Sequence, residues 1–271
     1  MKIDLHVHST YSDGIHPPRK LVEMAIGLGL AAISITDHDC LDGTEECATA
    51  AYQNGLEVIS GVELSCEFKE RDLHVLGYGV DPDDQRLQGM LKRFRDTRLE
   101  RGFKIIEKLR SLGVHLDTEE VLAKSRDGAL GRPHIAKALL ENGYVDNYSE
   151  AFERYIGEDG PAYIKKYKLH PREAVSYIRS AGGLAFIAHP TNSLKDANEL
   201  LELIAIGFDG LEVAHPNQTE GERAELEAIA KDYDLLASGG SDYHGFAGKD
   251  IPMGVPEIPY EFLERIKQRL G

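Results

Sequence analysis

Two histidines stand two residues apart near the start of the chain, in the sequence MKIDLHVHSTYSDG. His6 and His8 lie at the end of an expected strand, and Asp13 follows five residues later. Residues i and i+2 of a strand share a face, so both imidazoles can bind a single metal ion. A histidine alone near a strand end is more often a hydrogen-bonded structural residue. The interpretation therefore depends on metal-type residues elsewhere in the chain.

Further side chains of metal-binding type occur at or near the ends of later apolar runs. They are His38 in TDHD, Glu63, His74, His189 in AHP, and Asp242 with His244 in SDYH. In a (β/α) barrel the C-terminal strand ends converge on one face, where such folds place their chemistry. Burying nine such side chains without partners would be costly. The sequence therefore predicts a site for two or three divalent metal ions.

The composition of this ligand set bears on the type of reaction. It contains six imidazoles and three carboxylates, so three divalent ions would leave the pocket about three charges positive. Such a pocket attracts phosphate. Two or more ions can also generate hydroxide near neutral pH and neutralise charge on the phosphate oxygens. We expect metal-assisted hydrolysis of a phosphoester, with a metal-bridging hydroxide as the nucleophile and no side-chain nucleophile.

The elements that must position these residues alternate along the chain. Seven short apolar runs predict strands at residues 2–7, 30–36, 55–63, 72–80, 183–189, 209–215 and 235–242. Amphipathic stretches between many of them predict helices at 17–30, 43–55, 170–183, 196–207 and 219–234. This alternation of β and α favours a parallel sheet, either open or closed into a barrel.

The alternation stops between residues 84 and 166. Residues 83–113 could form one long helix, and shorter helices are expected at 118–125, 132–143 and 149–157. Because strand-like runs resume afterwards, a helical insertion is favoured over a separate terminal domain. We expect a barrel made of residues 1–83 and 167–271, and a helical insertion domain at 84–166.

Charge and cysteine content indicate which binding partners and which cellular compartment to expect. The net charge of −15, from 31 basic and 46 acidic residues, should repel polyanions. The basic stretch 91–110 is interpreted first as a solvated helix face. Three cysteines without a C-x-x-C pair (Cys40, Cys47 and Cys66) favour a reducing cytoplasm. No apolar run approaches the roughly 20 residues of a membrane helix, and no signal peptide or DNA-binding module is expected.

Taken together, the motifs DLHVHSTYSDG, ITDHD, IAHP and SDYHG, with GVELSCE and LHVLGY between them, form a specific set. Over essentially the whole chain the sequence resembles the PHP (polymerase and histidinol phosphatase) family of metal-dependent phosphoesterases. The resemblance implies a distorted (β/α)7 barrel, similar to a TIM barrel, and a substrate-capping helical insertion.

The resemblance also implies how the metal ligands are shared. His6, His8, Glu63 and Asp242 would hold a first ion. Asp13, His38 and His244 would hold a second. Glu63, His74 and His189 would hold a third, with Glu63 bridging. Family members commonly hold manganese, iron or zinc, and manganese is the expectation here, although mixed nitrogen and oxygen ligands discriminate weakly among these metals.

Two further features of the resemblance concern the substrate. An aspartate at position 13 is similar to the group acting on nucleoside 3′,5′-bisphosphates and RNA 5′ ends, as is the motif GRPH at residues 131–134. Arg132 and His134 are thereby implied to hold a substrate phosphate, for which guanidinium is suited. On its own, RPH indicates only a helix start with proline near N1. The expected substrates are pAp-like bisphosphates or short 5′-phosphorylated RNA.

Three alternatives stay open. A histidinol-phosphate-type or other small-molecule phosphatase shares the fold. An amidohydrolase also opens with H-x-H, but many carry a carboxylated lysine, and these strand ends show none. An inactive PHP module usually loses ligands, whereas all nine residue types are present.

Other residues near the cluster are interpreted more conservatively. His16, His115 and His170 are expected to be structural. His215, at a strand end, is expected either to line the pocket or to orient a ligand. Asp37 and Asp39 are expected to hold His38 in one tautomer.

Overall fold

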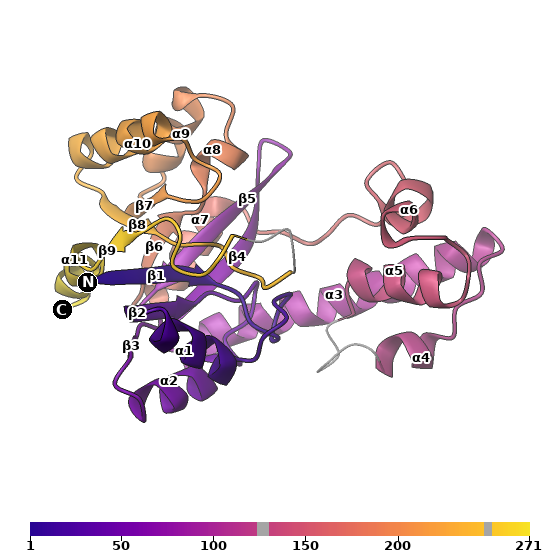
Figure 1. The fold of residues 1–271 in the computed structure, drawn as a ribbon. Helices are drawn as coiled ribbons and strands as arrows, with labels where there is room; N and C mark the ends of the chain where they lie inside the picture. Colours follow the sequence, from indigo (N-terminus) through magenta and orange to yellow (C-terminus); the bar gives the residue numbers. More distant parts are fainter. Residues whose placement is uncertain (124–129, 247–250) are drawn as a thin grey trace. The chain divides into compact units, whose positions relative to one another are not determined.

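The computed structural model describes residues 1–123, 130–246 and 251–271 (Figure 1). The chain divides into two compact units. The first, the sheet unit, comprises Met1–Gly89 and Lys168–Gly271, and the second, the helical unit, comprises Met90–Tyr167.

Two β-sheets form the sheet unit (Figure 1). One has the order β3-β2-β1-β9 and consists of β1 (Lys2–Val7), β2 (Leu30–Ile35), β3 (Glu57–Val58) and β9 (Ile258–Pro259). The other has the order β4-β5-β6-β7-β8 and consists of β4 (Gly61–Phe68), β5 (Arg71–Tyr78), β6 (Leu184–Ile187), β7 (Gly210–Ala214) and β8 (Leu236–Gly239). Mixed α/β content is thus confirmed.

The expected distorted (β/α)7 barrel is not confirmed, because the described residues form two sheets and no closed barrel. Nor is the second sheet all parallel, since β5 runs antiparallel to both β4 and β6. The cause is a two-residue turn at Lys69 and Glu70, whose φ angles of 51° and 63° suit a tight β-hairpin. Such a turn can only reverse the chain, whereas parallel neighbours need a crossover of a dozen or more residues.

Isolated bridges link each sheet to a segment that follows a strand of the other. Val7 of β1 pairs with Tyr243, which follows β8, and Glu63 of β4 pairs with His38, which follows β2. The apolar run 55–63, predicted as one strand, is divided because β3 pairs with β2 while β4 pairs with β5. This division places Glu63 inside β4, as the third residue of that strand.

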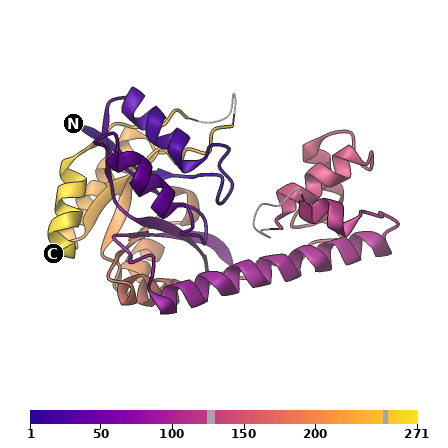
Figure 2. The same ribbon diagram turned by 90° about the horizontal axis from the view of Figure 1, so that it is seen from below.

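Helices cover the sheets of this unit. They are α1 (Pro18–Gly27), α2 (Thr44–Tyr52), α7 (Pro171–Ser180), α8 (Pro190–Ser193), α9 (Ala197–Ile204), α10 (Glu220–Asp232) and α11 (Glu261–Leu270). Helices α1 and α2 lie side by side (Figure 2), and α7, α10 and α11 pack on β6, β7 and β8. Five of these helices confirm sequence predictions. Helix α11 was not predicted, although Leu263 and Ile266 make an apolar stripe on it.

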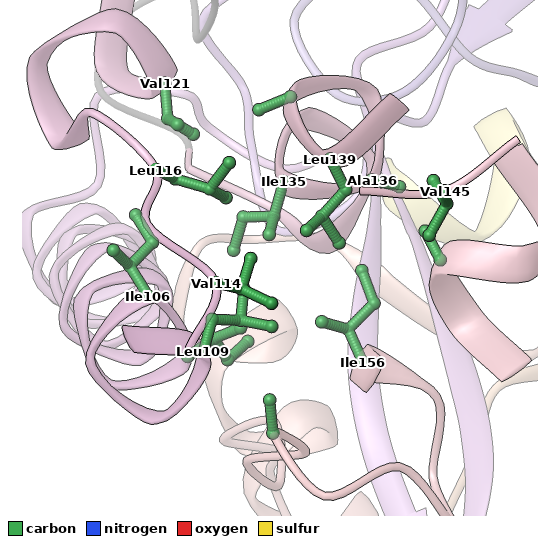
Figure 3. Close-up of a cluster of buried hydrophobic side chains, with 14 of the residues drawn as sticks. Ile106, Leu109, Val114, Leu116, Val121, Ile135, Ala136, Leu139, Val145 and Ile156 are labelled. Atoms are coloured by element: carbon green, nitrogen blue, oxygen red, sulfur yellow. The ribbon is translucent and has the colours of Figure 1, made fainter. Parts of the chain in front are cut away.

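The helical unit has its own hydrophobic core (Figure 3). Its elements are α3 (Gln85–Ser111, which begins in the sheet unit), α4 (Thr118–Ala123), α5 (Arg132–Glu141), α6 (Tyr148–Ala151) and a π-helical turn at Phe152–Ile156. Leu109 of α3 and Ile135 of α5 are fully buried in this core. The long helix and the start of α5 are as predicted. Residues 124–125, the end of the helix expected at 118–125, lie outside the described residues. Among the described helices none is long and apolar enough to cross a membrane.

Candidate metal centre

The structure brings the nine predicted side chains into one cluster centred on Glu63 of β4. Glu63 is fully buried, as are His6 of β1 and His8, which directly follows β1. Five imidazoles reach its two carboxylate oxygens. The distances are 3.5 Å from His6 Nε2, 3.3 Å from His8 Nε2, 2.9 Å from His38 Nδ1, 3.0 Å from His74 Nδ1 and 3.2 Å from His189 Nε2. A carboxylate with this many imidazoles around both oxygens can bridge cations.

Two further carboxylates extend the cluster. Asp242 Oδ1 lies 3.1 Å from His8 Nε2 and 3.3 Å from His6 Nε2. Asp13 lies 3.3 Å from His244 Nε2 and 3.7 Å from His38 Nε2. Three groups have ligand atoms within 4.8 Å of one another. They are His8, Asp13, His38 and His244, then His6, His8 and Glu63, and finally His38, Glu63 and His74.

His74 joins the cluster through the pairing of β5 with β4, which the sequence did not predict. It lies in the middle of the antiparallel strand β5, not at a C-terminal strand end, and it pairs with Ser65 of β4. Ser65 and Glu63 share a face of β4, and directly paired residues share that face as well. His74 is therefore a diagonal cross-strand neighbour of Glu63.

Buried serine–aspartate pairs hold the segments that carry these side chains. Asp37 accepts hydrogen bonds from Ser9 N and Oγ at 2.7 and 2.6 Å. Asp39 accepts from Ser65 N and Oγ at 2.8 and 2.9 Å. These hydrogen bonds go to serines and not to the ring of His38. The expected role of Asp37 and Asp39 in fixing the tautomer of His38 therefore stays a prediction.

The segment before Asp242 is fixed in the same way. Ser241 donates from N at 3.0 Å and from Oγ at 2.6 Å to the buried Asp4, which also accepts from Gly254 N at 2.7 Å. Asp242 itself has φ 51°, and His189 has φ 26°. Left-handed backbone at residues other than glycine is uncommon and persists where the surroundings determine it. Both positions are therefore held by their environment.

The electrostatics keep the carboxylates ionised. Burial alone would raise the pKa of Glu63, but His38, His74 and His6 hold it well below its usual range. Burial likewise opposes the lowered pKa of Asp242, which is set mainly by His6. Burial alone would lower the pKa of His8, yet Asp242 and Glu63 raise it to about 10. Positive charge is thus strongly favoured in the space between these groups, and a cation can supply it in place of protons.

Several buried atoms in the cluster lack a hydrogen-bond partner among the described residues. They are His6 Nε2, both ring nitrogens of His8, His38 Nδ1 and Glu63 Oε2. Carboxylate oxygens lie close to these nitrogens, but the angles between them are not those of a hydrogen bond. Buried polar atoms without partners are costly, and a coordinated cation satisfies them. The imidazole and carboxylate donors therefore fit divalent ions such as manganese, iron or zinc.

Two further buried residues contact the cluster: Glu212, which the sequence did not predict as a site residue, and His215, which was expected either to line the pocket or to orient a ligand. Glu212 of β7 lies 2.8 Å from His6 Nδ1 and accepts from His189 N at 2.7 Å. An acidic residue inside the apolar strand sequence GLEVA was the available signal. His215 Nε2 lies 3.4 Å from Asp242 Oδ2, and its Nδ1 accepts from Asn217 N at 3.2 Å. This contact favours the ligand-orienting interpretation of His215.

Arg132 and His134 belong to the helical unit. The guanidinium of Arg132 lies 5.9 Å from the Phe152 ring and 5.7 Å from the Tyr163 ring. His134 Nδ1 accepts from Gly131 N at 3.1 Å, which helps to start α5. His134 therefore contributes to the helix start that the sequence RPH by itself indicates, and its role in binding a phosphate stays a prediction.

Arg101 lies near Arg132. Its Nε donates to Ile164 O at 2.7 Å, while its Nη2 is buried without a partner among the described residues. Burial, with the charges of Arg132 and Arg98, lowers the pKa of Arg101 to about 10. Crowded cations of this kind are stabilised by a bound anion.

The outward face of α3 differs from this cluster. Lys92 pairs with Asp96 at 2.6 Å, and Lys104 pairs with Glu100 at 3.9 Å, and all four side chains are exposed. Exposed pairs of this spacing are worth little energy. These contacts agree with a solvated helix face.

Comparison with known proteins identifies the family of this chain. A family model described as the PHP domain matches residues 4–158. A 5′-3′ exoribonuclease of Haemophilus influenzae is 36% identical, and a 3′,5′-nucleoside bisphosphate phosphatase of Chromobacterium violaceum is 33% identical. The alignments cover 90% and 92% of this chain and 90% of each relative.

A solved structure of similar fold comes from Bifidobacterium adolescentis, from a protein assigned to the metal-dependent phosphoesterases. It is 33% identical with a TM-score of 0.85, and the match covers 98% of this chain and 96% of that one. The family match spans more than half of the residues and includes Glu63 and its neighbour His74. This chain therefore belongs to the PHP domain family.

Proposed function

We propose that this protein is a metal-dependent phosphoesterase that hydrolyses phosphate esters of nucleotides. The observation that carries the proposal is the cluster of nine metal-type side chains centred on the buried Glu63, in which five buried nitrogen and oxygen atoms have no hydrogen-bond partner among the described residues. The names of the relatives, a bisphosphate phosphatase and an exoribonuclease, support nucleotide substrates. We infer 3′,5′-bisphosphates such as pAp, short 5′-phosphorylated RNA, or both.

The nine side chains would hold three ions, with manganese preferred. His6, His8, Glu63 and Asp242 would hold the first, Asp13, His38 and His244 the second, and Glu63, His74 and His189 the third. Bound divalent ions supply acidified water near neutral pH and positive charge toward the phosphate oxygens.

The protein groups have separate tasks in this reaction. Glu63 contacts imidazoles through both oxygens, so it is suited to hold two ions at a fixed separation. Asp242 and Asp13, whose pKa values lie below their usual range although burial opposes this, stay ionised to hold cations. No side-chain nucleophile is required. Cys40 is not suited to be one, because burial raises the pKa of its thiol to about 12.

The helical insertion would bind the substrate. Arg132, assisted by His134 and Arg101, would hold a phosphate that is not being hydrolysed, since guanidinium makes paired hydrogen bonds to phosphate. The proximity of Arg101 to Arg132 supports this role. Burial, followed by repulsion from Arg132, lowers the pKa of Arg101, and a bound phosphate would offset that repulsion.

The test is a product analysis with one enzyme preparation and manganese. We would compare pAp with a ladder of 5′-phosphorylated oligoribonucleotides, measuring inorganic phosphate and released nucleotides. Asp242→Ala should abolish turnover of every phosphoester tested. If the wild type hydrolyses none of them, or if Asp242→Ala changes nothing, the proposal is wrong. Amine release from amide substrates would instead indicate an amidohydrolase.

A further inference from the structure

Glu212 is the only acidic residue of β7, and it is completely buried. Its Oε1 lies 2.8 Å from His6 Nδ1, and its Oε2 accepts from the backbone N–H of His189 at 2.7 Å. One carboxylate therefore contacts two segments, β1 and the turn after β6. Both segments carry residues of the proposed metal centre.

The bond to His6 determines which nitrogen of its ring can face a metal. With Nδ1–H donating to Glu212, the other nitrogen, Nε2, lies 3.3 Å from Asp242 Oδ1 and 3.5 Å from Glu63 Oε1. A metal-ligating histidine is usually fixed by such a carboxylate on its second nitrogen. His6 Nε2 has no hydrogen-bond partner among the described residues, as a ligand atom requires.

The bond to His189 fixes a backbone that would not adopt its conformation freely. His189 has φ 26°, a left-handed value that is uncommon for a residue with a side chain. The hydrogen bond from its N–H to Glu212 helps to hold that conformation. In it, the ring places Nε2 at 3.2 Å from Glu63 Oε1 and at 3.3 Å from His74 Nδ1.

We propose that Glu212 is a positioning residue that couples the first and third metal positions and leaves the second unaffected. It sets the tautomer of His6 for the first position and the backbone of His189 for the third. Neither of its two hydrogen bonds goes to Asp13, His38 or His244, the ligands of the second position. The inference rests on the proposed function, because it uses the same assignment of ligands.

The substitution Glu212→Gln separates this role from simple packing. The glutamine side chain has the same shape, but it offers one acceptor oxygen and one donor NH₂ group where glutamate offers two acceptor oxygens. It can therefore satisfy His6 Nδ1–H or His189 N–H, but not both. At least one of the two metal positions must therefore lose the hydrogen bond that orients its histidine ligand.

The measurement is calorimetric titration of the metal-free protein with manganese alone, with no substrate. Outer carboxylates of this kind typically contribute about 10- to 100-fold in metal affinity. In Glu212→Gln we expect a 10- to 100-fold weaker affinity for at least one of the three equivalents, with one equivalent unchanged. Glu57→Gln, which changes a carboxylate bound to Tyr260 and Lys267, is the matched control and should titrate as the wild type. Three unchanged equivalents, or three equally weakened ones, overturn the proposal.

A second measurement needs no variant, so a folding defect in Glu212→Gln cannot leave the proposal undecided. In zinc-loaded wild-type protein labelled with ¹⁵N-histidine, His6 should carry a slowly exchanging proton on Nδ1. His244, whose Nδ1 lies 2.8 Å from Asp242 O, provides an internal reference. A metal bound to Nδ1 of His6, or an unprotonated Nδ1, contradicts the role of Glu212. This failure is distinct from failure of the proposed function, since hydrolysis of pAp is measured separately.

Discussion

The two units of this protein differ in charge and in the kind of ligand that their side chains fit. The helical unit, Met90–Tyr167, holds 15 basic and 13 acidic residues, whereas the remainder holds 16 basic and 33 acidic ones. The whole negative balance of the chain therefore belongs to the sheet unit. A repulsion of polyanions inferred from the net charge applies to that unit and not to the helical one.

The difference extends to the buried polar groups of each unit. In the sheet unit, ring nitrogens of His6, His8 and His38 and the Oε2 atom of Glu63 have no hydrogen-bond partner among the described residues, and together they attract cations. In the helical unit, the unpartnered Nη2 of Arg101 lies in a cluster with Arg132 that attracts an anion. Under the proposed function, the side chains of the sheet unit would hold metal ions and those of the helical unit would hold a phosphate. Variants in the two units should therefore fail in different ways.

The largest effect is expected from Glu63→Gln in the sheet unit. Replacing one carboxylate oxygen with NH₂ places a donor among imidazoles that need an acceptor or a cation. We expect loss of bound manganese and a fall in kcat that exceeds the roughly 100-fold cost of an outer carboxylate. Elemental analysis and steady-state kinetics on pAp would measure both. Full metal content with full activity would remove Glu63 from the centre.

The next largest effect is expected from Arg132→Ala in the helical unit. Hydrogen bonds to charged groups contribute about 1.5–3 kcal/mol, which corresponds to about a 10- to 150-fold rise in KM. Metal content should stay that of the wild type. Arg132→Lys should recover only part of the loss, because lysine lacks the planar fork of donors.

Arg154→Ala is the matched control for that experiment. Arg154 lies in the same unit, but it is exposed and pairs with Glu150 at 2.6 Å. It should change KM little. If Arg132→Ala lowers metal content instead of raising KM, the division of tasks between the units is wrong.

The sequence predicts which polar side chains lie together better than it predicts the sheet. Residue type and spacing select His6, His8 and Asp242, which the fold brings together, because polar residues at the ends of apolar runs are conspicuous. The direction of β5 is not readable, since the turn at Lys69 and Glu70 contains no glycine or asparagine to mark a tight hairpin. Strand β9 is missed for another reason: it has two residues, too few to show a period.

Glu212 shows a second limit. A glutamate in a short apolar strand is visible in the sequence, but only three-dimensional contacts show that its two oxygens reach His6 and His189, which are 183 positions apart in the chain. Arg101 illustrates the same point in the helical unit. On the sequence it is one of eight basic residues in 91–110, and only its burial beside Arg132 separates it from exposed residues such as Lys104.

A small effect is expected from Lys104→Ala, which sharpens this contrast within α3. The exposed pair with Glu100 is worth at most about 1 kcal/mol, and a solvated lysine does not contact the proposed phosphate. We expect an unchanged KM for pAp and a thermal midpoint within a few degrees of the wild type, a shift typical of about 1 kcal/mol. A KM rise as large as that of Arg132→Ala would show that the outward face of α3 binds substrate.

The smallest effect is expected from alkylation of the thiols in the sheet unit. Cys40, Cys47 and Cys66 are all buried, and burial raises the pKa of Cys40 and Cys47 to about 12. At pH 8 only about one in ten thousand of these two thiols is ionised, and this fraction grows as the pH rises toward 12. Iodoacetamide at pH 8 should therefore leave the native protein unmodified and fully active, whereas the denatured protein should gain three adducts by mass spectrometry. Rapid modification of Cys40 with loss of hydrolysis would contradict a reaction carried by metal ligands alone, because it would place a reactive thiolate next to Asp39.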